Sequence, residues 1–296
     1  MNRLRWKDAP PNATDLPVLM PSAARLARAA AAERNAGHFR LRLAPAHGAA
    51  LLLLFAIGCA FAQAQAQPAH PSILATIWKW APLLLGGFLF NLAISVAAMA
   101  LGTFSGVLLG FAQISRLAPV ARGAWLVTHF FRNAPWLVLL FYCMLLLPFK
   151  ATLFGVAIPI PDWIKATFGL ALPVMANVSE ILRGAVQSIP TAQWESAASL
   201  AFTRRQTLWK IILPQCIKRM LPPWMNLYAI LTMATVLTSI VGVAEMMTLT
   251  GRALSAENRP GLLLAFYSFV LLCFFLYCYP IARWTVRLEA KYAVDH

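Results

Sequence analysis

The sequence is poor in charged residues, and poorest in acids. Only 12% of its 296 residues are Asp, Glu, Lys or Arg, and ten are acidic, whereas a soluble domain averages about 25% charged residues. Apolar residues make up 60% of the chain and gather in long blocks. So few charges are hard to reconcile with a water-facing surface, and we predict an all-α integral membrane protein with lipid as its solvent.

The sequence also lacks the usual signatures of metal, disulfide and catalytic sites. Its five cysteines contain no CxxC pair, and its five histidines are dispersed without metal-ligand spacing. The ten acids form no compact constellation, which argues against a membrane-embedded enzyme. No GxxxxGK[ST] motif is present, so the phosphate cradle of a P-loop ATPase is missing. We expect no catalytic residue, metal or cofactor in this chain, and no ATP hydrolysis by the chain itself.

Basic residues are abundant, with a formal net charge of +15. They lie in the loops between apolar spans, as in helical membrane proteins, and no nucleic-acid-binding motif accompanies them. We therefore expect lipid around the chain and no nucleic acid as a partner.

Residues 1–70 differ in composition from the rest. A basic, Ala-rich lead is followed by a signal-like segment at 49–66, whose fourteen apolar residues (49–62) would rise only about 21 Å as a helix, against a hydrocarbon core of about 30 Å. A short apolar region followed by small residues is typical of a signal peptide. An uncleaved anchor and a misassigned start codon are the alternatives.

The apolar segments of residues 71–296 predict a transmembrane domain. Five segments have roughly the length that a bilayer requires: 83–111, 125–147, 164–183, 222–244 and 261–282. The second is interrupted by Arg132 and Pro135, so its first half is expected at the membrane interface. Gly102, Gly106 and Gly110 recur every four residues, a spacing that lets another helix approach closely, and we favour packing within the chain over a dimer seam.

The charge of the loops predicts the orientation. Basic residues dominate the first and third loops and follow the last span, whereas Arg252 and Arg259 on the other side are partly balanced by Glu245 and Glu257. The positive-inside rule then places the third loop and the C-terminus in the cytoplasm.

The third loop, 184–221, is expected to hold two short helices. The first spans about 191–200, and the second begins at Thr203, which forms a capping box with Gln206. An apolar stripe on the second helix contains Leu208, Ile211 and Ile212, and Pro214 is expected to limit its continuation. Such a hairpin could simply lie on the membrane surface.

Five residues of this loop, in register, change that interpretation. Glu195, Ala197, Ile211, Leu213 and Pro214 resemble the EAA motif of permease subunits in binding-protein-dependent ABC importers. Two positions depart from the motif: Ser196 replaces an alanine and Ala201 replaces a glycine. Glycine would suit a left-handed residue at the end of the first helix, so Ala201 implies either a looser turn or tolerated strain of about 1 kcal/mol.

The resemblance runs from about residue 78 to the end. Segments 131–135, 180–184, 187–190, 193–195, 212–215 and 275–280 look like the polar amino-acid subfamily of these importers. This implies the type I importer (MetI-like) permease fold, with five core transmembrane helices and a cytoplasmic coupling-helix loop in the inner membrane. The implied partners are two copies of an ABC ATPase, a substrate-binding protein, a second permease (the same or a sister chain) and an amino acid. ATP and Mg²⁺ would be used by the partner ATPase and not by this chain.

The resemblance also implies roles for the loop residues. The loop would fit a cleft of the ATPase, with Glu195 accepting a hydrogen bond or ion pair from a basic ATPase residue. The residues expected to couple to the ATPase are Glu195, Ala197, Ala198, Ala201, Arg204, Arg205, Ile211, Leu213 and Pro214.

Polar residues inside spans are costly and usually face the bundle interior, so they are the candidates for a substrate pathway. Glu180 and Arg183 stand one turn apart, and a structural pair between them is favoured over contact with a zwitterionic substrate. The candidate residues are Asn177, Glu180, Arg183, Asn226, Thr235 and Thr238, within a wider set that adds Asn91, Ser95, Thr232 and Ser239. A secondary transporter is the main alternative, although we find no internal repeat.

Overall fold

The computed structural model describes residues 53, 57, 71–153 and 156–292. The predicted leader at 1–70, with its signal-like segment, falls almost entirely outside them. Helix α3 (Ile73–Gln113) comes first, and the Ser72 hydroxyl accepts a hydrogen bond from the Ala75 amide at 3.3 Å to cap it. Its 41 residues rise about 60 Å, so α3 contains the predicted span 83–111 and extends beyond it.

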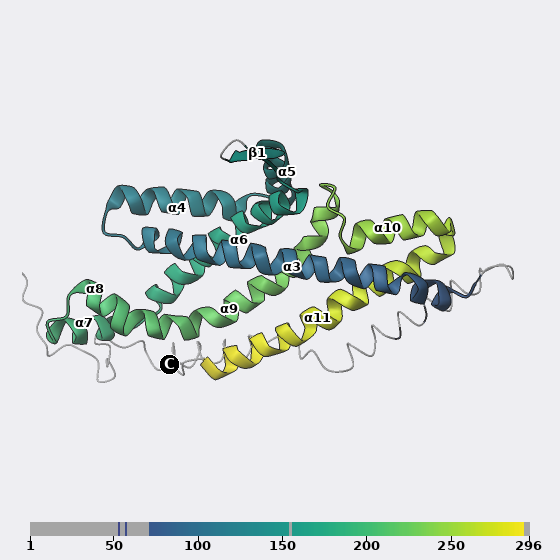
Figure 1. Ribbon diagram of the computed structural model, residues 1–296. Coiled ribbons are helices and arrows are strands. Elements are labelled where there is room, and N and C mark those ends of the chain that lie inside the picture. The colour runs from purple at the N-terminus through teal and green to yellow at the C-terminus, as the bar shows by residue number, and fades with distance from the viewer. Residues whose placement is uncertain (1–52, 54–56, 58–70, 154–155, 293–296) are drawn as a thin grey trace, which may run out of the picture. The chain divides into compact units, whose positions relative to one another are not determined.

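The second predicted span is broken. Helices α4 (Ala118–Asn133) and α5 (Trp136–Leu146) meet at an angle of 106° (Figure 1). The break falls at Ala134, which is extended with ψ 137° because the ring of Pro135 disfavours a helical residue before it. An antiparallel hairpin that the sequence did not predict follows, with β1 (Lys150–Leu153) pairing β2 (Val156–Pro159) in the register Lys150 to Pro159.

Helix α6 (Asp162–Gln187) packs along α3 through the predicted glycine stripe. A Cβ placed on Gly102 would lie 2.5 Å from Val174, and one on Gly106 would lie 2.6 Å from the carbonyl oxygen of Met175. The stripe therefore packs within the chain, as expected. Side chains larger than hydrogen would force the two helices apart.

The third loop forms α7 (Thr191–Ser199) and α8 (Arg204–Thr207), and the chain then stays helical. A π-helical turn, η2 (Leu208–Ile212), leads into α9 (Leu213–Ala234), with Pro214 in its first turn and Pro222 and Pro223 inside it. The expectation that Pro214 limits the helix is wrong, because the helical structure continues through η2 into α9. In an α-helix the ring of Pro214 would clash with the carbonyl group four residues earlier, and the wider π turn lies at this point. Proline also lacks an N–H group, which the first turn of a helix does not require.

The last part of the chain contains one helix that the sequence did not predict. After the 3₁₀ turn η3 (Thr235–Ser239) comes α10 (Met246–Glu257), which ends at Asn258 in the left-handed conformation. A second 3₁₀ turn, η4 (Pro260–Leu262), leads into α11 (Leu263–Tyr292). The predicted fourth span, 222–244, therefore lies on α9 and η3 as far as Ser239, and its last five residues follow η3. The fifth, 261–282, lies on η4 and α11.

Length and apolarity alone qualify three helical stretches of the described residues to cross a membrane, and a fourth if the bent pair α4–α5 counts as one span. Helix α6, the third predicted span, does not meet this criterion. It carries Asp162, Lys165, Glu180 and Arg183, and fourteen of its residues are buried against neighbouring helices. A helix enclosed by others needs less apolar surface than one surrounded by lipid, so its charges do not argue against its central place.

Candidate functional site

Helix α7 ends in a tight turn built around Ala201. This residue has φ 55°, the Phe202 amide donates to the Ala197 carbonyl at 3.1 Å, and the Ala201 amide donates to the Ala198 carbonyl at 2.9 Å. These two bonds form a Schellman motif, in which glycine usually occupies the left-handed position. The turn is therefore as tight as the glycine of the motif would make it, and the strain of alanine is tolerated.

The next helix begins with the predicted capping box. The Thr203 hydroxyl accepts from the Gln206 amide at 3.4 Å, and the Gln206 side chain accepts from the Thr203 amide at 2.9 Å. The turn between α7 and α8 is thus held by backbone hydrogen bonds on the α7 side and by bonds between side chains and backbone on the α8 side.

An apolar cluster joins this hairpin to the long helices. Ile212 and Cys216 are buried and pack with Leu182 and Val186 near the C-terminal end of α6. Partly buried residues around the cluster come from α3, α7, η2 and α9: Val107, Phe111, Ile114, Trp194, Leu208, Ile211, Leu213 and Met220. The predicted apolar stripe is therefore the contact between the hairpin and the long helices, and the cluster includes side chains of α3, α6 and α7.

The outer surface of the hairpin carries exposed charged side chains beside exposed small and apolar ones. Glu195 is exposed, Ala197 is buried, and Ala198, Ala201, Arg204, Arg205 and Pro214 are exposed. A hollow of about 440 Å³ beside them is lined by Arg116, Trp194, Ala198, Phe202, Arg204 and Thr207. The hairpin thus offers an exposed acid, and its Arg204 lines the hollow together with Arg116 of the first loop.

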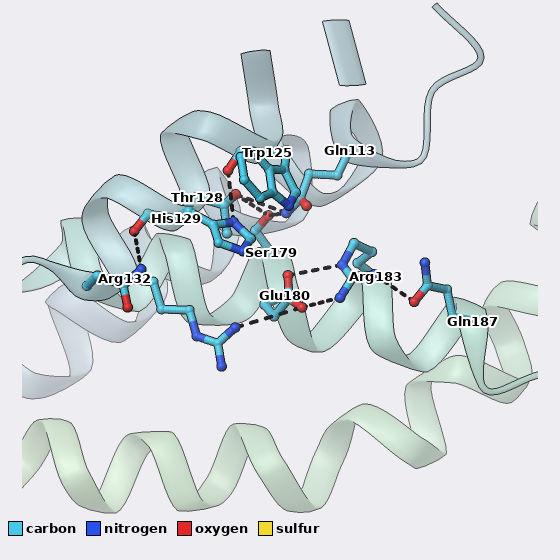
Figure 2. A network of polar contacts seen from close by, with 10 residues as sticks. Gln113, Trp125, Thr128, His129, Arg132, Ser179, Glu180, Arg183 and Gln187 are labelled. Carbon is cyan, nitrogen blue, oxygen red and sulfur yellow. Dashed lines mark hydrogen bonds and ion pairs between the residues drawn. The ribbon is translucent and has the colours of Figure 1, made fainter. Parts of the chain in front are cut away.

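A second cavity, of about 450 Å³, lies between α4, α6 and α9. Its polar lining includes Arg132, Asn177, Glu180 and Arg219. Glu180 is bonded by Arg183 on its own helix and lies 3.8 Å from the Arg132 guanidinium of α4 (Figure 2). The Glu180–Arg183 pair favoured from the spacing is therefore present.

Neighbouring polar contacts hold this cavity in place. The Gln113 amide of α3 donates to the Thr128 hydroxyl of α4 at 2.9 Å, and both bond the Ser179 hydroxyl of α6, beside Glu180 (Figure 2). On the other side, the Arg219 guanidinium of α9 donates to the carbonyl oxygen of Ser188 at 2.7 Å. This bond joins the end of α6, just before the hairpin, to α9, which lines the cavity.

Comparison with known proteins decides the family. Residues 92–291 match the family described as "Binding-protein-dependent transport system inner membrane component", and this segment contains the hairpin and the cavity. The chain belongs to this family. It is accordingly a permease: a multi-pass membrane subunit that works with an ATPase and a binding protein in an importer.

Individual relatives agree with this assignment. The permease is 32% identical to the "Probable amino-acid ABC transporter permease protein YckA" of Bacillus subtilis over 212 residues, covering 72% of this chain and 90% of the relative. It is 31% identical to the "Glutamine transport system permease protein GlnP" of Escherichia coli over 191 residues, covering 62% of this chain and 82% of the relative.

Solved structures show the same fold. A chain described as "Crystal structure of an amino acid ABC transporter with histidines" superposes with a TM-score of 0.66 at 23% identity, covering 75% of the permease and 99% of that chain. A chain of the MetNI methionine ABC transporter gives 0.54 at 18% identity, covering 74% and 98%. The expected type I importer permease fold is thereby confirmed.

The predicted substrate-pathway residues of the permease separate into three groups. Asn177, Glu180 and Arg183 lie at or beside the cavity of α6, whereas Asn226 is exposed on α9. Thr235 and Thr238 are fully buried elsewhere, and the Thr235 hydroxyl accepts from the Asn91 amide at 2.9 Å.

Sequence reasoning missed Glu245 as a buried group. Its carboxylate caps α10 by accepting from the amides of Met247 at 3.0 Å and Thr248 at 2.9 Å, and it also accepts from Asn91 at 2.9 Å. From the sequence, Glu245 was interpreted as one of the charged residues of a loop. No local signal marked this role, because Glu is not among the residues that N-cap positions favour and α10 itself was not predicted.

Proposed function

We propose that this permease moves amino acids across the cytoplasmic membrane in an ATP-driven importer, and that the ATPase acts on it through the α7–α8 hairpin. The observation that carries this proposal is the hairpin itself, with an exposed Glu195, a tight turn and an apolar attachment to α3 and α6. By the loop charges, the hairpin and the C-terminus face the cytoplasm, where such an ATPase would lie.

The exposed and the buried residues of the hairpin would have different roles. Glu195, Ala198, Arg204 and Arg205 would meet the ATPase, because their side chains are exposed on the hairpin. The buried or partly buried members of the expected set (Ala197, Ile211 and Leu213) would instead transmit the movement inward. Ala201 sets the turn, and Pro214 lies at the return of the chain towards the membrane.

The chain has no phosphate cradle, so ATP and Mg²⁺ would be bound by two ATPase copies, and this chain would bind no cofactor. A binding protein would deliver the substrate from the outer side. A second membrane subunit, either the same chain or a sister chain, would complete the pathway.

Amino acids are the proposed substrates because the relatives named above carry amino-acid or glutamine transport in their descriptions. The chemistry of the cavity fits a zwitterion. Arg132 and Arg219 offer guanidinium groups for an α-carboxylate, and Glu180 with Asn177 offers oxygens for an ammonium group. Thr235, Thr238 and Asn226 lie outside this lining, so the proposed substrate site does not include them.

Replacing Glu195 by lysine tests the coupling role. The reversed charge would face the basic ATPase residue with which Glu195 is proposed to pair, so we expect uptake by the reconstituted importer to fall at least tenfold while membrane insertion is unchanged. Glu289→Lys, which reverses an exposed acid on α11, is the matched control and should transport normally. Wild-type uptake by Glu195→Lys would count decisively against the coupling role.

Replacing Glu180 by glutamine tests the cavity. We expect the KM for amino-acid uptake to rise, because the side chain keeps its size but loses one acceptor oxygen and the charge that attracts an ammonium group. Basal ATP hydrolysis should stay the same, since the hairpin is untouched. A KM equal to that of the wild type would place the substrate elsewhere.

A further inference from the structure

A large apolar groove lies between α3, α9 and α11, away from the hairpin and the charged cavity. Its volume is about 850 Å³, within the range of roughly 300–1,000 Å³ found for ligand pockets. Val96, Met99, Met225 and Ile281 contribute to its walls. Such a lining suits a hydrocarbon chain and offers little to an amino acid.

The groove and the charged cavity lie on opposite faces of α9. Leu221, Trp224, Met225 and Tyr228 follow the i, i+3, i+4, i+7 spacing of one helix face and line the groove. Arg219 and Pro223, four residues apart, line the cavity. Because residues 219 and 221 are about 200° apart around a helix, the two hollows face away from each other.

The polar groups in the wall of the groove satisfy one another. The Tyr228 and Tyr277 hydroxyls lie 2.8 Å apart, and Tyr228 lies 3.4 Å from the Ser95 hydroxyl. The Trp224 indole N–H donates to Thr103 at 2.9 Å. Since these groups already have partners, an acyl chain could lie against them without leaving a donor unpaired.

One end of the groove is charged. Arg287, one turn after Trp284 near the C-terminal end of α11, lines this end with an exposed side chain, and no ion pair involving it is found among the described residues. Trp284 is 59% exposed beside it, as expected of an aromatic residue at a membrane interface. An apolar trough that ends at an indole and a guanidinium matches the shape and charge of an anionic amphiphile.

We propose that this groove is a binding site for an anionic phospholipid of the cytoplasmic leaflet, with an acyl chain along Met99, Met225 and Ile281 and the phosphate paired with Arg287. The choice of leaflet rests on the orientation in the proposed function. A second copy of the chain is the competing occupant. We favour lipid because two membrane subunits that share a substrate pathway would meet on the face of α9 that lines the charged cavity. The opposite face of α9, which lines the groove, would then face the bilayer.

Native mass spectrometry of the full-length chain, titrated with phosphatidylglycerol or phosphatidylcholine, tests the site. We expect the wild type to retain phosphatidylglycerol preferentially. Arg287→Gln should reduce that preference about fivefold, the equivalent of about 1 kcal/mol for one basic residue at an anionic surface. Arg122→Gln, which removes an exposed arginine of α4, is the matched control and should leave the preference unchanged.

Filling the groove gives a second, independent variant. Ala100 is exposed in the groove, and Ala100→Phe should weaken retention of both lipids because it occupies the acyl-chain volume. Unchanged preference in Arg287→Gln, or an equal loss in Arg122→Gln, would overturn the proposal. Efficient disulfide cross-linking between two copies of Ala100→Cys in the bilayer would also overturn it in favour of a second chain. Lipid retention is measured without transport, so the lipid site and the proposed transport function can each fail without the other.

Discussion

Replacing Gly106 by alanine should loosen the contact between α3 and α6 that supports both the hairpin and the cavity. The new Cβ would lie 2.6 Å from the Met175 carbonyl oxygen and 2.7 Å from Val178 Cβ, whereas ordinary contact begins at 3.4 Å. The helices would have to separate by about 0.8 Å at this point. The obstacle at 2.6 Å is backbone, so a side-chain rotation cannot relieve it.

The expected cost is about 1–3 kcal/mol, the usual penalty for overpacking a close contact. Gly86→Ala is the matched control, because Gly86 lies on the same helix and a Cβ there meets nothing within 4 Å. That control should be neutral or stabilised by about 0.5–1 kcal/mol, since alanine favours a helix interior over glycine.

Thermal unfolding of the two variants in the same detergent, monitored by loss of the monodisperse protein, measures the difference. We expect Gly106→Ala to unfold several degrees below the wild type and Gly86→Ala at or above it. Equal unfolding temperatures for the two variants would refute the packing argument, because the substitutions differ only in what the methyl group meets.

Two further predictions concern local stability. Ala201→Gly should relieve the left-handed strain by about 1 kcal/mol, so amide exchange at Phe202 should slow about fivefold; faster exchange would contradict the Schellman geometry. Hydrogen bonds from Lys79 and then Trp80 hold the pKa of Glu257 below its usual range. The ionised Glu257 carboxylate therefore stabilises the folded protein fully above about pH 4.3, the pKa of a free Glu, and this stabilisation is lost as the pH falls through the lowered pKa. The Tm difference between the wild type and Glu257→Gln should accordingly narrow in acid, and a constant difference would rule out this contribution.

Much of the helical framework could be predicted because it depends on local pattern. The length of the apolar blocks located the long helices, and the spacing of Gly102, Gly106 and Gly110 located a close helix contact. Thr203 and Gln206 gave the capping box, since capping uses residues only three apart. The left-handed position of Ala201 was foreseen as one of two outcomes.

The remaining features depend on contacts between distant residues. The burial of Glu245 requires Asn91, which is 154 residues away in the sequence, so the residue resembled an ordinary loop charge. Pro214 was expected to limit a helix because the preceding π turn gave no recognisable signal. Arg132 and Arg219 join Glu180 in one cavity only because α4, α6 and α9 pack together. The sequence placed Arg132 in the interfacial half of the second span and Arg219 in the third loop, so neither was a candidate for the substrate pathway.

The most direct test of the account is the energy source of transport. Proteoliposomes that contain this permease with its ATPase, and that receive the binding protein outside, can be assayed for uptake of labelled amino acids. We predict uptake that requires enclosed ATP, persists when the proton gradient is collapsed, and is lost in Glu195→Lys. Uptake driven by a proton gradient without ATP would contradict the account.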